Sequence, residues 1–144
     1  MILLTPALRF ALRANAINAQ AAERDGRRPP DPLPVIKLFN PIGAATWLAT
    51  ELYGDDDTLF GIADLGFGSP ELGTFSLSEI AGVRLPFGMG IERDIAFATI
   101  HPLSIWADTA RRAGSILWAE TLLRRAAQSG DPELPTPPDT GNAG

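Results

Sequence analysis

Residues 34–97 alternate between short apolar runs and turn-forming residues, and this alternation constrains the fold more than any other feature of the chain. The runs are rich in aromatic and β-branched residues, and glycine, proline or aspartate separates them at regular intervals. Short runs bounded by turn residues are typical of β-strands joined by hairpins. Sequential hairpins give antiparallel neighbours, because parallel neighbours need long crossover connections. We therefore expect an antiparallel β-meander in this segment.

The meander is predicted to contain about five strands. Their expected ranges are 35–39, 46–53, 58–65, 71–75 and 91–100. Before the last strand, Ser76-Leu77-Ser78-Glu79 has the spacing of a capping box, which predicts a short helix that ends near Gly82. Glu79 is thereby expected to serve the helix terminus and not a catalytic site.

Helical patterns flank the meander on both sides. Thr5 and Pro6 form a favourable helix start, and the Ala-rich sequence that follows predicts a helix to about Glu23, followed by a Pro-rich connector. A C-terminal helix is expected from about 103 to 128, bent or broken at Gly114. The tail from 129 to 144 is rich in Pro, Gly and Asp and is predicted to be disordered.

Together these elements predict one α+β domain over residues 1–128: a small antiparallel β-sheet flanked by an N-terminal and a C-terminal helix. The helical arm and connector occupy 1–33, the β-module 34–100 and the C-terminal helix 101–128. Elements of this kind, with strands grouped together and helices at the ends, are typical of α+β proteins.

Charge is distributed unevenly along the chain. Residues 34–97 contain nine acidic and three basic residues, a formal charge of −6, whereas residues 1–33 contain five arginines and three acidic residues, a charge of +2. The opposite signs predict that the N-terminal helix docks on the β-module. The total charge of −5 argues against a general nucleic-acid binder, which needs a basic excess to neutralise phosphates.

The absence of cysteine and the presence of one histidine exclude several kinds of chemistry. Disulfides, thiolate catalysis and sulfur-ligated metals are ruled out, and a zinc site would need carboxylates almost alone. We expect no cofactor. No apolar run approaches the length of a membrane span, and the first ten residues lack the features of a signal peptide, so a cytoplasmic location is expected.

The sequence Glu92-Arg93-Asp94 is the most chemical-looking motif of the chain. On a strand, Glu92 and Asp94 lie on one face and Arg93 on the other, among apolar neighbours. A guanidinium in such surroundings needs a partner, since burying it unpaired is costly. Glu51, on the second predicted strand, is the expected partner.

The remaining carboxylates have two readings. Asp64 could join Glu71, Glu92 and Asp94 in a metal-binding cluster, or its carboxylate could accept backbone N–H bonds in the Gly66–Gly68 turn. The run 55–57 lacks the ligand spacing of a calcium loop and is expected to be a solvated hairpin turn. His101 stands between a strand and a helix without a nucleophile in recognised spacing, and is expected to be a junction residue.

Several of these segments also carry a family resemblance. The motifs are Val35 to Pro41 with Thr46-Trp47, then Phe60-Gly61, Asp64-Leu65-Gly66, Pro70-Glu71-Leu72-Gly73, Ser76 to Glu79, and finally Arg84, Pro86, Gly88 and Glu92-Arg93-Asp94. In this order they resemble the bacterial family known as domain of unknown function 2958 (DUF2958), as does the helix opening Leu4-Thr5-Pro6 with Asn15. The resemblance implies no activity and transfers no functional residue. It implies a setting in plasmids and other mobile elements, beside antirestriction and conjugation genes.

Three functions follow as hypotheses. The first is a non-enzymatic accessory protein that binds a host or plasmid protein, with a role in evading restriction or other defences; its expected interaction residues are Glu51, Asp55, Asp56, Asp57, Glu92, Arg93 and Asp94. In this hypothesis the carboxylates imitate phosphates. The second is a metal-dependent hydrolase or nuclease that uses Asp64, Glu71, Glu92 and Asp94. The third is a DNA-binding accessory protein that acts through Arg9, Arg13, Arg27 and Arg28.

Overall fold

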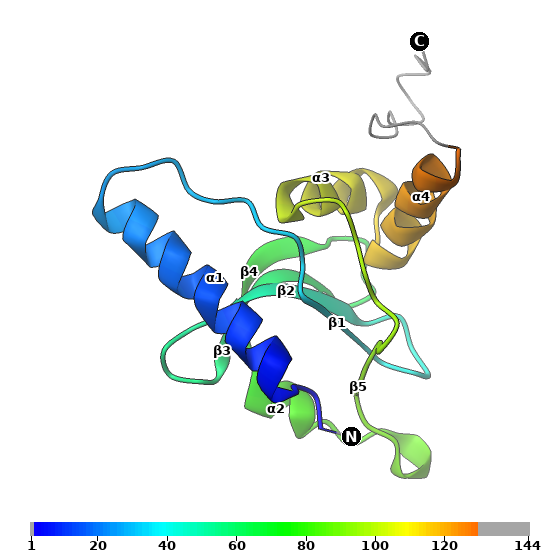
Figure 1. Cartoon of the computed structure of the whole chain (residues 1–144). Helices are drawn as coiled ribbons and strands as arrows, with labels where there is room; N and C mark the ends of the chain where they lie inside the picture. The colour runs from blue at the N-terminus through cyan, green and yellow to red at the C-terminus, as the bar shows by residue number, and fades with distance from the viewer. Residues whose placement is uncertain (1, 130–144) are drawn as a thin grey trace.

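A five-stranded antiparallel sheet forms the centre of the protein, with helices on both faces (Figure 1). The computed structural model describes residues 2–129. Its strands are β1 (Ile36–Phe39), β2 (Thr46–Leu52), β3 (Thr58–Asp64), β4 (Glu71–Ser76) and β5 (Glu92–Arg93). Its helices are α1 (Pro6–Arg24), α2 (Leu77–Ala81), α3 (Leu103–Ala113) and α4 (Ile116–Gln128), with a 3₁₀ turn at Pro86–Gly88. The predicted α+β fold class is confirmed.

The strand order is β4-β3-β2-β1-β5, so the first four strands form the predicted meander and the fifth does not continue it. β5 pairs with β1, with Leu38 opposite Arg93 and Phe39 opposite Glu92. The strand predicted over 91–100 is much shorter because Asp94 ends it: the Asp94 carboxylate accepts the N–H of Ala96, and the Asp94 carbonyl accepts the N–H of Phe97. This turn directs the chain towards α3.

The two faces of the sheet bury separate hydrophobic cores. The first core joins Leu12 of α1 and Ile80 of α2 to Leu38 and Leu59 of the sheet. The second core joins α3 and α4 to the sheet side chains that alternate with these, such as Leu48 and Ile62. Strand side chains point alternately to opposite faces, so both faces of this sheet are covered by apolar contacts.

α1 docks across β2, as the charge distribution predicts. Thr5 caps the helix by accepting the N–H of Leu8 at 3.2 Å. Further along, Arg13 Nη1 donates to the carbonyl of Leu52 at 2.7 Å, and Asn15 Nδ2 donates to the carbonyl of Thr50 at 2.8 Å. Polar side chains of the helix therefore satisfy backbone carbonyls of the strand.

A β-bulge at Thr50 interrupts the pairing of β2 with β3. Ala49 is opposite Gly61 and Glu51 is opposite Phe60, so Thr50 has no partner of its own in the register. The strands approach so closely here that a Cβ on Gly61 would lie 1.8 Å from the carbonyl oxygen of Leu48. A bulge shifts every later side chain of its strand to the other face.

The predicted C-terminal helix is two helices. Gly114 adopts a left-handed conformation with a φ of 84° and ends α3. Ser115 then caps α4 by accepting the N–H of Trp118 at 3.0 Å. Within residues 2–129 no helix combines the length and the apolar character that crossing a membrane requires. The tail predicted to be disordered lies, from residue 130 onward, outside the described residues.

Candidate functional site

The three aspartates of the β2–β3 turn contact three different parts of the molecule. Asp55 closes the turn itself, because its Oδ1 accepts the N–H groups of Asp57 and Thr58 at 3.0 and 2.8 Å. Asp56 forms an ion pair with Arg9 of α1. Asp57 binds the β4–α2 junction, where its Oδ2 accepts the Ser76 hydroxyl at 2.7 Å. The turn is therefore a junction between segments as well as an acidic surface.

These contacts keep the turn negatively charged. The hydroxyl and N–H of Thr58 lower the pKa of Asp55 to about 2. The pKa of Asp57 is also lowered, mainly by the Ser76 hydroxyl and then by the Ser78 N–H. Hydrogen bonds to a carboxylate favour its ionised form. Asp55 and Asp56 remain exposed to solvent, so their charges are presented on a fixed framework.

The predicted interaction residues fall into two separate groups. Residues 55–57 lie beyond the Leu52 end of β2, whereas Glu92 lies beside Phe39, which pairs with Thr46 at the other end of β2. Figure 1 shows β5 and the β2–β3 turn on opposite sides of the sheet. The acidic surface predicted from the sequence is therefore not one continuous patch.

Arg93 contacts the N-terminal segment. Its Nη1 donates to the carbonyls of Leu3 and Ile2 at 2.7 and 3.2 Å. The predicted partnership with Glu51 is wrong, since the bulge at Thr50 turns Glu51 to the face opposite Arg93. Burial raises the pKa of Glu51, because desolvation disfavours the ionised carboxylate.

Lys37 is the buried centre of a charge cluster on the α4 side of the sheet. Lys37 is only 7% exposed. Its Nζ lies 2.8 Å from Glu120 Oε1 and 3.6 Å from Asp94 Oδ2. Arg124, one turn along α4, approaches the same Glu120 oxygen at 3.7 Å. Two cations and two carboxylates therefore balance one another where β1, the end of β5 and α4 meet.

Asp64 has the structural role that turn chemistry predicts, and it has a second one. Its Oδ1 accepts the N–H of Gly66 at 2.9 Å, and its Oδ2 accepts the N–H of Ile116 at 2.8 Å. A carboxylate is stabilised at the N-terminus of a helix, so Asp64 joins the end of β3 to the start of α4. Each oxygen of its carboxylate therefore accepts one backbone N–H.

The carboxylates of the hypothetical metal site are not brought together. Asp64 contacts the start of α4 and Asp94 contacts Lys37, while Glu71 begins the edge strand β4 and Glu92 lies on β5. Across residues 2–129, no three carboxylate or imidazole side chains are grouped closely enough to hold a metal ion. The four-residue cluster predicted from the sequence is therefore not formed.

The arginines of the DNA-binding hypothesis are mostly occupied by the protein itself. Arg9 pairs with Asp56, and Arg13 donates to the carbonyl of Leu52. Arg27 lies 3.5 Å from Asp25, and Arg28 is exposed in the connector. The pattern fits the docking of α1 better than a surface prepared for phosphates.

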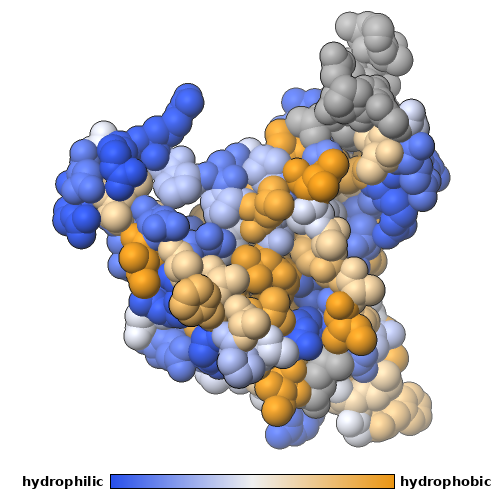
Figure 2. All heavy atoms as spheres, viewed as in Figure 1, coloured by the Kyte–Doolittle hydropathy of each residue, from blue (hydrophilic) through white to orange (hydrophobic). Residues whose placement is uncertain are grey.

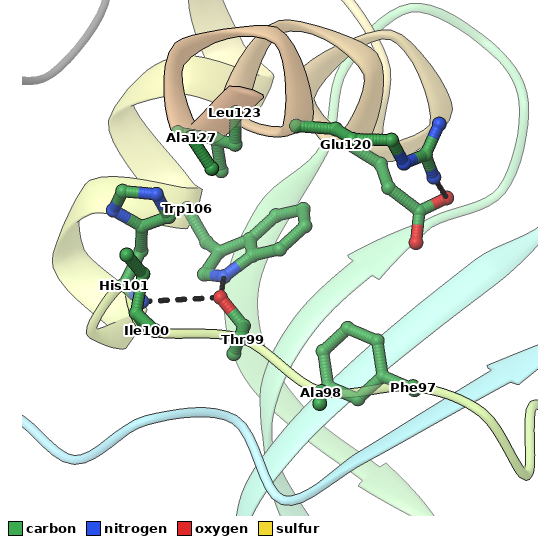
Figure 3. A pocket seen from close by; sticks show the side chains of 10 residues that line it. Phe97, Ala98, Thr99, Ile100, His101, Trp106, Glu120, Leu123 and Ala127 are labelled. Carbon is green, nitrogen blue, oxygen red and sulfur yellow. Dashed lines mark hydrogen bonds and ion pairs between the residues drawn. The ribbon is translucent and has the colours of Figure 1, made fainter. Parts of the chain in front are cut away.

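A cavity of about 310 Å³ lies between residues 97–101 and the helices α3 and α4, close to the Lys37 cluster. In Figure 3, Trp106 lines the cavity between Phe97, which lies below it, and Leu123 and Ala127, which lie above it. Trp106 Nε1 donates to the Thr99 hydroxyl at 3.0 Å, and the same hydroxyl accepts the N–H of His101 at 3.1 Å. Glu120 and Arg124 form the charged part of the wall.

His101 belongs to this cavity and is more than a junction residue. Its Nε2 is buried and has no hydrogen-bond partner within the described part of the chain. Burial lowers the pKa of the imidazole below its ordinary value of 6.5, because desolvation disfavours the charged form. His101 therefore lines the cavity, and its imidazole favours the neutral form, with Nε2 closed off from the cavity space.

Sequence reasoning places the site near the strand 92–94 but does not identify the cavity. Its residues come from the segment after β5 and from two helices, and they carry no motif. The single histidine of the chain was the one available signal. Its neighbours Trp106, Glu120 and Arg124 read from the sequence as ordinary positions of an amphipathic helix.

Comparison with known proteins gives one match. A family model described as "Protein of unknown function (DUF2958)" matches residues 3–117. No curated protein and no solved structure matches the chain. The matched range contains α1, every strand of the sheet, α2, α3 and the first residues of α4, which is well over half of the 144 residues. The chain therefore belongs to the DUF2958 family.

Proposed function

We propose that this chain is a non-enzymatic interaction protein that binds a partner protein through the outer face of α1 and the adjoining acidic turn. The observation that carries the proposal is the exposure of two large apolar side chains on α1. Phe10 is 76% exposed and Ile17 is 53% exposed. Residues seven apart lie on the same side of a helix, and Ala14 lies between them. Figure 2 shows apolar side chains along α1 on this face.

The acidic turn supports the same face. Arg9, the neighbour of Phe10, pairs with Asp56, so the turn is held against α1. Asp55 and Asp56 are exposed, and hydrogen bonds keep Asp55 ionised. An apolar centre beside fixed charge is the usual composition of a protein interface, in which apolar anchors supply affinity and charges raise the association rate.

The partner's surface is therefore proposed to be basic, with an apolar hollow for Phe10 and Ile17. Within the mobile-element setting that the DUF2958 resemblance implies, a host or plasmid protein that handles DNA has such a basic surface. The carboxylates of the turn would then occupy positions that phosphates occupy otherwise. This is the anti-restriction or anti-defence role that the family resemblance suggests, with the binding surface proposed to lie on the α1 side of the molecule.

The test is a binding experiment with matched variants. The full chain is immobilised, proteins retained from a bacterial lysate at low salt are identified, and the strongest is purified for affinity measurements. The double variant Phe10→Ala/Ile17→Ala is expected to weaken binding at least about ten-fold, mainly through faster dissociation. Asp56→Asn is expected to slow association and to reduce the salt dependence. Asn tolerates the positive φ of 63° at this position, so the turn keeps its shape.

The control is Phe87→Ala, which removes an equally large exposed side chain from the 3₁₀ turn, outside the proposed face. It is expected to leave the affinity unchanged. The proposal fails if Phe87→Ala weakens binding as much as the α1 double variant does. It also fails if the affinity is independent of salt, since an acidic turn must lose affinity as salt screens it.

A further inference from the structure

The two edges of the sheet are built differently. β5, at one edge, has two residues and ends at the Asp94 turn, whereas β4, at the other edge, has six residues and pairs with β3 in unbroken register (Figure 1). Proteins protect edge strands from other chains by keeping them short or by placing lysine, proline or a bulge in them. β4 contains no lysine, no proline and no bulge, and its one charged residue is Glu71 at its start.

The backbone groups of β4 that point away from β3 follow from the ladder. The N–H of Leu77 donates to the Asp57 carbonyl at 2.9 Å, just beyond the last pair of the two strands. In antiparallel strands, hydrogen-bonded pairs alternate with pairs that make no bond to each other. Every second residue counted back from Leu77 therefore bonds to β3, Gly73 among them. The N–H and C=O groups of the residues between, Leu72 and Thr74, face the outer edge.

This outer edge is accessible. Leu72 is 44% exposed, and Thr74 is also exposed. No backbone group elsewhere in residues 2–129 bonds to Leu72 or Thr74 from the outer side. A Cβ on Gly73, which lies between them, would meet nothing within 4 Å. The space beside β4 is therefore free for another strand.

The outer edge of β4 is complementary to a second copy of itself. When two β4 strands run antiparallel with Gly73 opposite Gly73, Leu72 of each copy faces Thr74 of the other, and each of these residues donates one hydrogen bond and accepts one. At the ends of the paired segment, Ser76 meets Pro70. Pro70 has no N–H to donate, and the carbonyl of Ser76, the N-cap of α2, already serves the first turn of that helix.

Other registers of the same pairing are less favourable. A shift by two residues in one direction places Thr74 opposite Pro70, which cannot donate to it, and a shift in the other direction places Leu72 opposite the occupied carbonyl of Ser76. In the register centred on Gly73, Glu71 faces Phe75 of the other copy, so like charges do not meet.

We propose that the exposed edge of β4 binds β4 of a second copy of this chain, antiparallel and centred on Gly73, so that the two sheets become one. The two-fold axis is perpendicular to the joined sheet, so α1 of both copies lies on the same side of it. This edge is separate from the α1 face, and it can pair whether or not that face binds a protein. An interface made mainly by two short strands is small, so the dimer is weak, with a dissociation constant on the order of 0.1 mM.

The first test measures the mass of the full chain as its concentration rises. Sedimentation equilibrium from about 5 µM to about 1 mM brackets the expected dissociation constant. The weight-average mass is expected to rise from 15.4 kDa towards twice that value. Thr74→Pro removes an outward N–H without removing a bond to β3, and it is expected to remain monomeric. The control Thr74→Ala keeps this N–H and is expected to associate as the wild type does, with circular dichroism confirming that both variants fold.

Leu72→Lys tests the same edge through charge. In the dimer the two introduced lysines lie diagonally across the axis, where like charges repel, so association is expected to weaken at least about ten-fold. The control Ile95→Lys replaces another exposed apolar residue with the same charge, just beyond β5 at the opposite edge of the sheet, and is expected to associate normally.

Because the chain has no cysteine, a single introduced cysteine reports the register. Gly73→Cys places two thiols directly opposite each other, in a pair whose Cα atoms are about 4.5 Å apart, which a disulfide can span. Mild oxidation is therefore expected to link the two copies. In the control Thr74→Cys the two thiols are offset along the strands by two residues, and little linkage is expected.

Four results would overturn the proposal. The first is the mass of a single chain at every concentration, and the second is association of Thr74→Pro equal to that of the wild type. The third is linkage of Thr74→Cys as efficient as that of Gly73→Cys, which excludes the register. The fourth is slow hydrogen exchange at the Leu72 and Thr74 amides in the dilute monomer, which would show that another part of the same chain covers the edge.

Discussion

Asp64 Oδ2 accepts the backbone N–H of Ile116 at 2.8 Å, so a carboxylate at the end of β3 fixes the first residue of α4. Its other oxygen holds the turn that follows β3 through Gly66. One side chain therefore positions both the edge hairpin and the helix that covers the cavity.

Asp64→Ala is expected to lower the free energy of unfolding by about 3 kcal/mol, because it leaves two N–H groups without acceptors in a buried region. Asp64→Asn keeps one acceptor oxygen, so its free energy of unfolding is expected to fall by less. The measurement is urea unfolding followed by circular dichroism. As a control, Asp108→Ala removes an exposed partner of Arg112 and is expected to cost under about 1 kcal/mol. Equal losses for Asp64→Ala and Asp108→Ala would contradict the capping role.

Gly61→Ala and Gly73→Ala form a matched pair, because the two glycines face each other across β3 and β4. A Cβ on Gly61 would lie 1.8 Å from the Leu48 carbonyl oxygen, whereas one on Gly73 would meet nothing within 4 Å. We expect Gly61→Ala to destabilise the protein by about 3 kcal/mol or more. Gly73→Ala is expected to be neutral or to stabilise by up to about 1 kcal/mol. Thermal and urea unfolding of both variants provide the comparison.

Lys37 and Glu120 are expected to be energetically coupled. Lys37→Met leaves two carboxylates without their buried cation and is expected to destabilise by about 2–3 kcal/mol. In Lys37→Met/Glu120→Gln one of these carboxylates is neutral, so the double variant is expected to be more stable than the sum of the single losses predicts. The double-mutant cycle compares the free energies of unfolding of the wild type, the two single variants and the double variant. A coupling energy near zero would show that the Lys37–Glu120 pair makes no specific contribution to stability.

Asp55 is expected to make stability fall in acid. Its pKa in the folded protein is about 2, below the ordinary value of 3.8, so the folded state prefers the ionised form. This contribution is fully present above pH 3.8 and disappears as the pH falls towards 2. The difference in urea midpoint between the wild type and Asp55→Asn should therefore be largest near pH 5 and should be mostly lost at pH 2. A constant difference across this range would exclude the effect.

Glu51 is expected to act in the opposite direction. Desolvation raises its pKa above the ordinary value of 4.5, so the folded state disfavours the ionised carboxylate. Its favourable contribution is present below pH 4.5 and is lost as the pH rises through the higher pKa of the folded protein. Glu51→Gln should then be more stable than the wild type at pH 7, and the two should converge below pH 4.5. A variant that is less stable at pH 7 would indicate an ionic partner for Glu51.

Local patterns predicted much of the fold. Thr5 before Pro6 predicted the start of α1, Ser76 predicted the cap of α2, and the turn residues 54–57 predicted the β2–β3 hairpin. Each of these signals acts within a few residues, so neighbouring sequence contains all the information. The break at Gly114 was readable for the same reason, since glycine tolerates the positive φ that ends α3.

Contacts between distant residues were not predictable in the same way. The pairing of β5 with β1 depends on the turn at Asp94, and the orientation of Glu51 depends on a single unpaired residue at Thr50. The cavity joins residues from three elements, and Lys37 meets Glu120 across 83 positions of the sequence. A one-residue shift in a strand reverses a face, so spacing alone cannot assign such partners.

β5 lies far from its partner strand β1 in the sequence, so it is synthesised much later. The partner of β1 at one edge, β2, follows it directly in the sequence, but the partner at its other edge is completed only with Glu92 and Arg93. Until then, the growing chain presents an open strand edge, which is the kind of surface that recruits other chains. Arg93 then contacts Ile2 and Leu3, which precede it in the sequence by 91 and 90 positions. Synthesis slowed between β1 and β5 should therefore favour aggregation more than the same delay after Arg93.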